Sequence, residues 1–135
     1  MHKNACNIGK AYFLIANEGP KATSPEYLPY QLLTEYLAGS KTSPLQADLI
    51  IDKALLDDVY MEAWPRRYAK GWQPFAAETE VNKVAPSVDG FWRLIEEVKS
   101  TGVSESELNF AKKRLLKAHW RTLDDQYEVA SALAT

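Results

Sequence analysis

Histidine side chains are the first candidates for catalysis or metal binding in this sequence, and there are only two of them. His2 lies beside the chain terminus, where backbone order is commonly lost. His119 is followed three and four residues later by Thr122 and Leu123, which provide no second metal ligand. Neither H-x-x-E-H nor H-E-x-x-H occurs. We therefore predict no catalytic residue and no metal ligand, and we interpret His119 as an ordinary surface or partly buried histidine.

Adjacent carboxylates are the next candidates, because paired acids can act as general acid and base. Neighbouring side chains on a helix point about 100° apart, so adjacency in sequence does not bring two carboxylates onto one substrate. We interpret these pairs as parts of solvated surfaces. They are Asp57-Asp58, Glu96-Glu97 and Asp124-Asp125.

The segment PRRY, Pro65 to Tyr68, places two arginines next to an aromatic ring at the tip of an expected hairpin. Guanidinium groups there could meet an acidic partner or a peptide carboxylate, although a solubilising tip is the simpler interpretation. Gly-rich phosphate loops, a G-x-S-x-G elbow and a Cys/His dyad are all absent. The motifs alone therefore name no substrate-binding residue.

Composition indicates an ordinary globular chain of 135 residues, with 46% hydrophobic and 25% charged residues. A net charge of −2 with interspersed signs argues against a nucleic-acid surface. No segment is long and apolar enough to predict a membrane span, so we expect the chain as given to be soluble. Its compartment, periplasm or cytoplasm, is left open. Cys6 is the only cysteine, which rules out an internal disulfide, and a small partly buried residue is its expected role.

The elements that would position these residues follow from periodicity. Ile8 to Asn17, short and rich in aromatic and branched residues, predicts a largely buried strand. Val59 to Trp64 and Trp72 to Val81 predict an antiparallel pair. In the second of these, we expect one face to carry a set of apolar and small residues and the other to carry two acids. The first face holds Phe75, Ala77, Thr79 and Val81, and the second holds Glu78 and Glu80.

Helix signals alternate with these strands. Ser24-Pro25 and Ser43-Pro44 each supply an N-cap followed by a proline at the first helical position, and they predict helices ending near Gly39 and Lys53. Ser87 is the expected N-cap of a helix that ends at Gly102. Ser104 and Glu107 form a capping-box pattern, which predicts a helix from about Glu105. No glycine or proline follows it before the last residue, so we expect one long helix to Thr135.

This order of elements predicts an α+β fold in which an antiparallel sheet of three strands carries helices on one face. The helices starting near Pro25, Phe91 and Glu105 are expected to cover that face.

Longer phrases of the sequence resemble the M16 (insulinase/pitrilysin-like, inverzincin) peptidase family. GVSESELNFAKKRLLKAHWRTLDDQYEVASALA is similar to the end of an M16 domain, and FWRLIEEVKS to the helix before it. PEYLPYQLLTEYLAGSKTSPLQADLIIDKALLDDVYMEA resembles the family's helix, Gly-Ser turn, second helix and strand, and KGWQPFAAETEV its next strand. The resemblance extends from about Ile8 onward. It implies that residues 1–135 form a single partial M16-like (LuxS/MPP-like) domain, the C-terminal portion of one domain.

In this family the zinc motif lies upstream of the portion matched here. The resemblance therefore implies no cofactor in this chain and zinc in the parent protein. Active members carry an Arg and a Tyr in the second domain, within S-R-L-x-x-x-L-R-E-x-x-G-L-A-Y. Laid over Ser43 to Asp57, this sequence has Pro44 and Ile50 at the two arginines and Asp57 at the tyrosine. No substrate-holding residue is carried over.

The resemblance implies a non-catalytic fragment of an M16 zinc peptidase that contributes to a peptide-enclosing chamber and to domain packing. The alternative is a structural or interaction domain of a non-peptidase M16 homologue, and a free-standing α+β binding module is a further reading. The expected partners are the remainder of the parent protein and, through it, a peptide substrate. An exposed sheet edge also predicts self-association, most simply as a two-fold homodimer.

Overall fold

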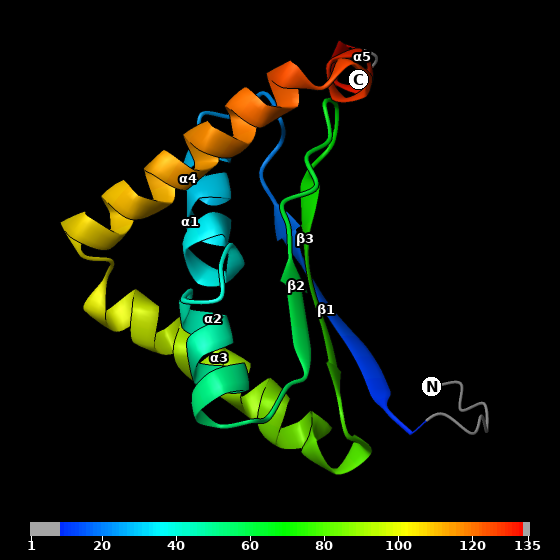
Figure 1. Cartoon of the computed structure of the whole chain (residues 1–135), viewed down its shortest axis with the longest axis vertical. Coiled ribbons are helices and arrows are strands. Elements are labelled where there is room, and N and C mark those ends of the chain that lie inside the picture. Colours follow the sequence, from blue (N-terminus) through cyan, green and yellow to red (C-terminus); the bar gives the residue numbers. More distant parts are fainter. Residues whose placement is uncertain (1–8, 134–135) are drawn as a thin grey trace.

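The computed structural model describes residues 9–133, and its centre is a sheet of three antiparallel strands in the order β1-β3-β2. The strands are β1 (Ala11–Gly19), β2 (Asp58–Met61) and β3 (Gly71–Thr79). The helical elements stand on one side of the sheet and leave its other side bare (Figure 1). They are α1 (Tyr27–Ala38), α2 (Pro44–Gln46), the π-helix η1 (Ala47–Asp52), the 3-10 helix η2 (Val81–Lys83), α3 (Val84–Thr101), α4 (Glu105–Asp124) and α5 (Gln126–Leu133). The predicted α+β fold is confirmed.

The core lies between the inner face of the sheet and the helices. Phe75, at the middle of β3, is fully buried between Phe13 of β1 and Phe91 of α3, with ring centroids 6.0 and 4.3 Å away. Such aromatic pairs add to the stability that comes from burial alone. The other buried hydrophobic residues around this stack are Leu37, Leu45, Leu49, Leu56, Val59, Ala77 and Leu94.

Buried polar side chains on the inner face all have partners. Gln73 of β3 donates from Nε2 to Oγ1 of Thr34, 2.5 Å away, which ties the sheet to α1. The hydroxyl of Thr79 donates to the backbone carbonyl of Leu55. Because each group keeps a hydrogen bond, burial of these polar atoms does not carry the full desolvation cost. These bonds fix the position of α1 and of the segment before β2 relative to β3.

The start of α3 differs from the prediction. The helix begins at Val84, and Ser87 is not its N-cap but a fully buried residue inside the first turn. Its hydroxyl donates 2.7 Å to the carbonyl of Lys83, as serine can within a helix, and 3.2 Å to that of Leu55. The strand before it also ends earlier than predicted, at Thr79, and Val81 lies exposed in η2.

Glycine permits the close approach of α3 to η1. A Cβ atom at Gly90 would lie 2.7 Å from Cδ2 of Leu49, so no larger residue fits between the two elements without a shift. At the other end of α3, Gly102 has a φ of 75°, a left-handed conformation that glycine adopts without strain. The predicted helix end at Gly102 is confirmed.

Helix α4 forms an outer layer that packs on α1 rather than on the sheet (Figure 1). Ala111 is its buried residue, and Arg114 forms an ion pair of 2.7 Å with Glu35 of α1. The helix ends at Asp124, so the expectation of one unbroken helix to Thr135 is wrong for residues 105–133. Asp125 takes an extended conformation, and its Oδ1 accepts from the backbone N–H of Tyr127, 2.9 Å away, at the start of α5. An N-cap aspartate, rather than glycine or proline, makes the break.

The predicted capping box at the start of α4 is present. The backbone N–H of Glu107 donates to Oγ of Ser104 over 3.3 Å, and the backbone N–H of Ser104 donates to Oε2 of Glu107 over 3.0 Å. The Ser104 hydroxyl also donates to that carboxylate. These hydrogen bonds hold the pKa of Glu107 below its ordinary value of 4.5.

Ser104→Ala is expected to destabilise the protein by about 1 kcal/mol, the usual effect of losing a serine N-cap. Because the pKa of Glu107 is lowered on folding, its contribution is complete above pH 4.5 and is lost as the pH falls through the lower folded value. The stability difference between wild type and Ser104→Ala should therefore shrink on acidification. Urea unfolding at pH 7 and at pH 3 measures it. An equal difference at both values would show that the carboxylate plays no part.

Candidate functional site

The carboxylate pairs noted in the sequence lie apart on the surface and bind lysines, arginines or backbone groups. Glu96 and Glu97 contact different partners, Lys99 at 2.7 Å and Arg93 at 3.3 Å. Asp58 accepts from the backbone N–H of Val59 over 2.9 Å. Asp57 faces Lys10 at 3.4 Å, and Asp124 is exposed. Within residues 9–133 there is no group of three or more His, Cys, Asp or Glu side chains that could hold a metal ion.

His119 is exposed on α4, with its ring 6.3 Å from that of Trp120. His2 and Cys6 lie outside the described residues. The PRRY tip is also exposed, and the guanidinium of Arg67 lies 5.7 Å above the ring of its neighbour Tyr68. The tip is anchored from the side, because the carbonyl of Arg66 accepts from the N–H of Ala22. Among the candidates that lie within residues 9–133, none converges with another.

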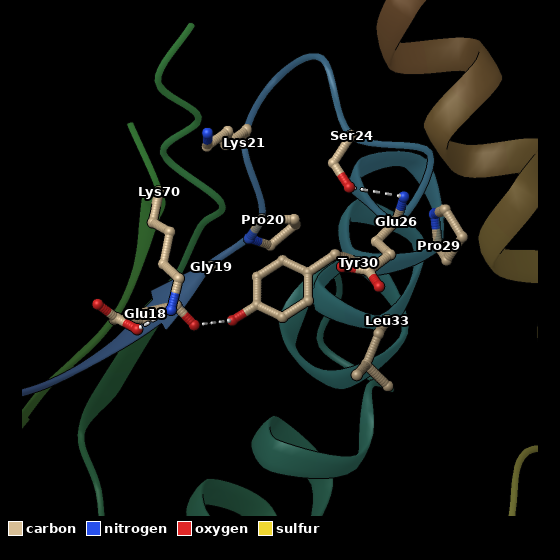
Figure 2. Close-up of a pocket in the computed structure, with 10 residues that line it drawn as sticks. All are labelled: Glu18, Gly19, Pro20, Lys21, Ser24, Glu26, Pro29, Tyr30, Leu33 and Lys70. Atoms are coloured by element: carbon tan, nitrogen blue, oxygen red, sulfur yellow. Dashed lines mark hydrogen bonds and ion pairs between the residues drawn. The ribbon is translucent and has the colours of Figure 1, made fainter. Parts of the chain in front are cut away.

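The structure shows instead an open cleft of about 700 Å³ where β1 ends and α1 begins (Figure 2). Its wall is formed by two prolines, a tyrosine and a leucine, and charged side chains surround it. In Figure 2 the ring of Tyr30 points from α1 toward the end of β1, and its hydroxyl donates to the carbonyl of Glu18 over 3.4 Å. The lining residues are Glu18, Gly19, Pro20, Lys21, Ser24, Glu26, Pro29, Tyr30, Leu33 and Lys70.

Two of the four charged side chains that line the cleft, Lys70 and Glu18, are paired with each other. Nζ of Lys70 lies 2.6 Å from Oε2 of Glu18, and this contact raises the pKa of the lysine. Partial burial raises the pKa of the Tyr30 hydroxyl, so the phenol stays protonated at neutral pH. The cleft therefore offers an apolar wall and the protonated hydroxyl of Tyr30, and it is also lined by Lys21, Ser24 and Glu26. Sequence reasoning missed it because the stretch from Glu18 to Leu33, which supplies every lining residue except Lys70, carries no binding motif.

The outer face of the sheet is the second candidate surface. The even-numbered residues of β1 point away from the helices, and Leu14 is 60% exposed. Register places Leu14 beside Ala76 of β3, which lies beside Tyr60 of β2. One apolar row thus crosses all three strands. With Tyr12 at one end and Trp72 at the other, the whole bare face of the sheet is apolar at its middle.

This face corrects the prediction that the first strand is largely buried. AYFLIA is apolar at both odd and even positions, a composition typical of strands covered on both faces. In the structure only the odd positions, such as Phe13 and Ile15, pack against the core. The sequence thus showed that both faces of the strand are apolar. The face formed by the even positions, however, has no covering layer among residues 9–133. None of the helices in those residues is long and apolar enough to cross a membrane.

Solved structures with the same fold come from several organisms. One is a peptidase M16 inactive domain from Pseudomonas fluorescens, with 19% identity and a TM-score of 0.73, over 82% of this chain and 27% of that one. Another is a protease from Helicobacter pylori, with 19% identity and a TM-score of 0.82, over 94% of this chain and 31% of that one. A third is a chain of complex III2 from Candida albicans with Inz-5 bound, with 20% identity and a TM-score of 0.80, over 95% of this chain and 32% of that one.

The sequence spans about a third of the length of these chains. No curated protein matches it. A family model described as the peptidase M16 inactive domain matches residues 4–115, most of the chain. The match includes the strands, the cleft and the helices that pack on the core. The chain therefore belongs to the peptidase M16 inactive domain family.

Proposed function

We propose that this chain is the non-catalytic part of an M16 peptidase, and that the outer face of its sheet helps to enclose peptide and to pack against neighbouring domains. The observation that carries the proposal is the apolar row across the three strands, which has no cover in the described residues. Exposed apolar patches of this kind mark interaction sites. Membership of an inactive-domain family fits a role in holding rather than cutting.

The free edge of β1 lies next to this face. β1 is nine residues long and, within the described part of the chain, pairs on one side only, with β3. An extended peptide can add to such an edge through main-chain hydrogen bonds, while the apolar row contacts its alternate side chains. The edge and the face together would select extended apolar segments with little dependence on sequence. This is the behaviour expected of a chamber wall that holds varied peptides.

A structural role in a non-peptidase homologue is the second candidate. The likeness to a chain of complex III2 supports it, because that protein is part of a multi-subunit assembly. In that case the outer face contacts a fixed protein neighbour and not a changing peptide. Self-association of this chain as a two-fold dimer would use the same face or edge.

Leu14→Lys should weaken the binding of a labelled, unstructured peptide rich in Val and Phe by about tenfold, since it places a charge within the apolar row, on the strand next to the free edge. Fluorescence anisotropy measures the affinity. Leu28→Lys, at an equally exposed leucine on α1, is the matched control and should change nothing. Failure of the wild-type chain to bind the peptide at all would remove the peptide-holding role.

Sedimentation equilibrium separates the second candidate from the first. A dimer that dissociates on dilution and is abolished by Leu14→Lys, without any peptide binding, would favour the structural role. Peptide binding by a monomer that stays monomeric at high concentration would favour the chamber role.

The purified chain should bind no stoichiometric zinc and hydrolyse no peptide, because His119 stands alone on α4 without a converging carboxylate or second histidine in residues 9–133. Metal analysis of tag-free protein and a peptide cleavage assay check both statements. One zinc ion per chain that disappears in His119→Ala would contradict the first. The zinc of the proposed peptidase would be held by residues outside this chain.

A further inference from the structure

The side of α4 that faces away from α1 carries a narrow apolar stripe. It consists of Leu116, Trp120 and Leu123, which are 58%, 64% and 50% exposed. Their spacing of four and three residues places them in one line along the helix. We call these three residues the α4 stripe. It lies on the opposite side of the helix from Ala111, the residue that α4 buries against the rest of the protein.

Positive charges border the α4 stripe. Lys112 lies along one side of it, and Lys113 and Lys117 lie along the other together with one acid, Asp124. All four side chains are exposed. Among residues 9–133, none of these lysines has a partner in the ion pairs of the structure. Arg114, the neighbouring cation on α4, does have a partner, because it points to α1 and forms an ion pair with Glu35. The apolar stripe and the unpaired lysines therefore form one surface.

The charges decide what can occupy this surface. In a parallel pair of α4 helices these lysines would face lysines, whereas in an antiparallel pair Lys117 would face Asp124 of the other copy. Because the borders carry three lysines and one acid, an acidic partner matches more of their charge than a second copy does. A second copy of this chain is thus disfavoured. A bilayer is also disfavoured, because helices that lie in a membrane interface have a broad apolar face, whereas this one is a single line that ends at Asp124. A narrow seam with charged borders is the geometry of helix-to-helix pairing.

We propose that the α4 stripe is a docking site for an acidic amphipathic helix of a partner protein. The partner's leucine-type side chains would pack between Leu116, Trp120 and Leu123, and its carboxylates would meet Lys112, Lys113 and Lys117. This site is separate from the outer sheet face, since α4 stands on the helical side of the molecule (Figure 1). It does not depend on the proposed peptide-holding role.

The test uses the whole chain and a designed peptide of about four heptads, with leucine at the seam and glutamate along both borders. The same peptide with lysine in place of glutamate is the charge control. Titration calorimetry at low salt is expected to show binding of the glutamate peptide only, and the affinity should fall as salt is raised. Trp120→Ala and the double variant Lys113→Glu, Lys117→Glu should each weaken binding by at least about tenfold.

Tyr68→Ala, at an exposed aromatic residue of the hairpin tip, is the matched variant and should bind as wild type does. All these side chains are exposed, so circular dichroism should show an unchanged fold. Equal binding of both peptides, no binding of either, or no effect of Trp120→Ala would overturn the proposal. Stronger binding to vesicles of phosphatidylserine and phosphatidylcholine than to the glutamate peptide would overturn it in favour of a lipid surface.

Discussion

Phe75→Ala is expected to lower the free energy of unfolding by about 3–5 kcal/mol, the range for deleting a fully buried phenylalanine side chain. Phe75 is 0% exposed and is the central ring of the stack formed with Phe13 and Phe91. Its removal leaves a cavity where β1, β3 and α3 meet, and the rigid strands on either side cannot close it. Domains of this size have only about 5–15 kcal/mol of stability, so the loss is a large fraction of the total.

Urea unfolding followed by circular dichroism measures this effect. Tyr12→Ala is the matched control, because Tyr12 is also aromatic and lies in the sheet but points to the bare outer face. Its removal should cost less than about 1 kcal/mol, as for most surface substitutions. Equal losses in the two variants would mean that the outer face is covered in solution, and that the inner stack does not dominate stability.

Gly71→Ala is expected to cost about 1–3 kcal/mol, the usual penalty for adding a methyl group where there is no room. A Cβ atom at position 71 would lie 2.6 Å from the carbonyl oxygen of Trp64 and 2.8 Å from that of Pro20. Both contacts are to backbone, so no side chain can rotate away. The segments that follow β1 and β2 would have to move apart from the start of β3, and the Trp64-Trp72 bridge would be disturbed.

Gly9→Ala is the control, because a Cβ atom there would contact nothing within 4 Å. Thermal unfolding of the two variants gives the comparison directly. If Gly71→Ala is as stable as Gly9→Ala, the close approach of the three segments is looser in solution than in the structure. Peptide binding at the outer face should be reduced in Gly71→Ala, since the same segments border that face.

Local signals predicted most of the helices and strands. The capping box at Ser104, the glycine at position 102 and the serine-proline start at Ser43 each act through their own few residues, so the sequence is enough to place them. Ser87 was wrongly predicted as an N-cap because serine has two common roles in a helix. It can cap the first turn, or it can lie inside the helix and donate to a carbonyl four residues earlier, as Ser87 does to Lys83. The break at Asp125 carries no glycine or proline signal, because an aspartate N-cap alone makes it.

The candidate surfaces were harder to predict. The cleft is formed by the turn from β1 into α1 with Lys70 beside it, and no local pattern in that turn shows that the chain leaves an open space there. The outer sheet face was predictable in part, because AYFLIA is apolar at both odd and even positions. The sequence does not show which of the two faces of the strand is left uncovered by helices. The α4 stripe was recognisable only once Ala111 and Arg114 showed which side of the helix faces inward.

The strand order has a consequence for how the chain folds. β2 and β3 are joined by a short hairpin, whereas pairing β1 with β3 closes a loop that contains α1, α2, η1 and β2. Closing the longer loop costs more chain entropy, and such non-local pairings slow folding. The hairpin is therefore the natural nucleus, and β1 joins it later. Until β1 docks, β3 presents an open edge and an uncovered apolar strand, which makes this interval the one in which newly made chains are most exposed to aggregation.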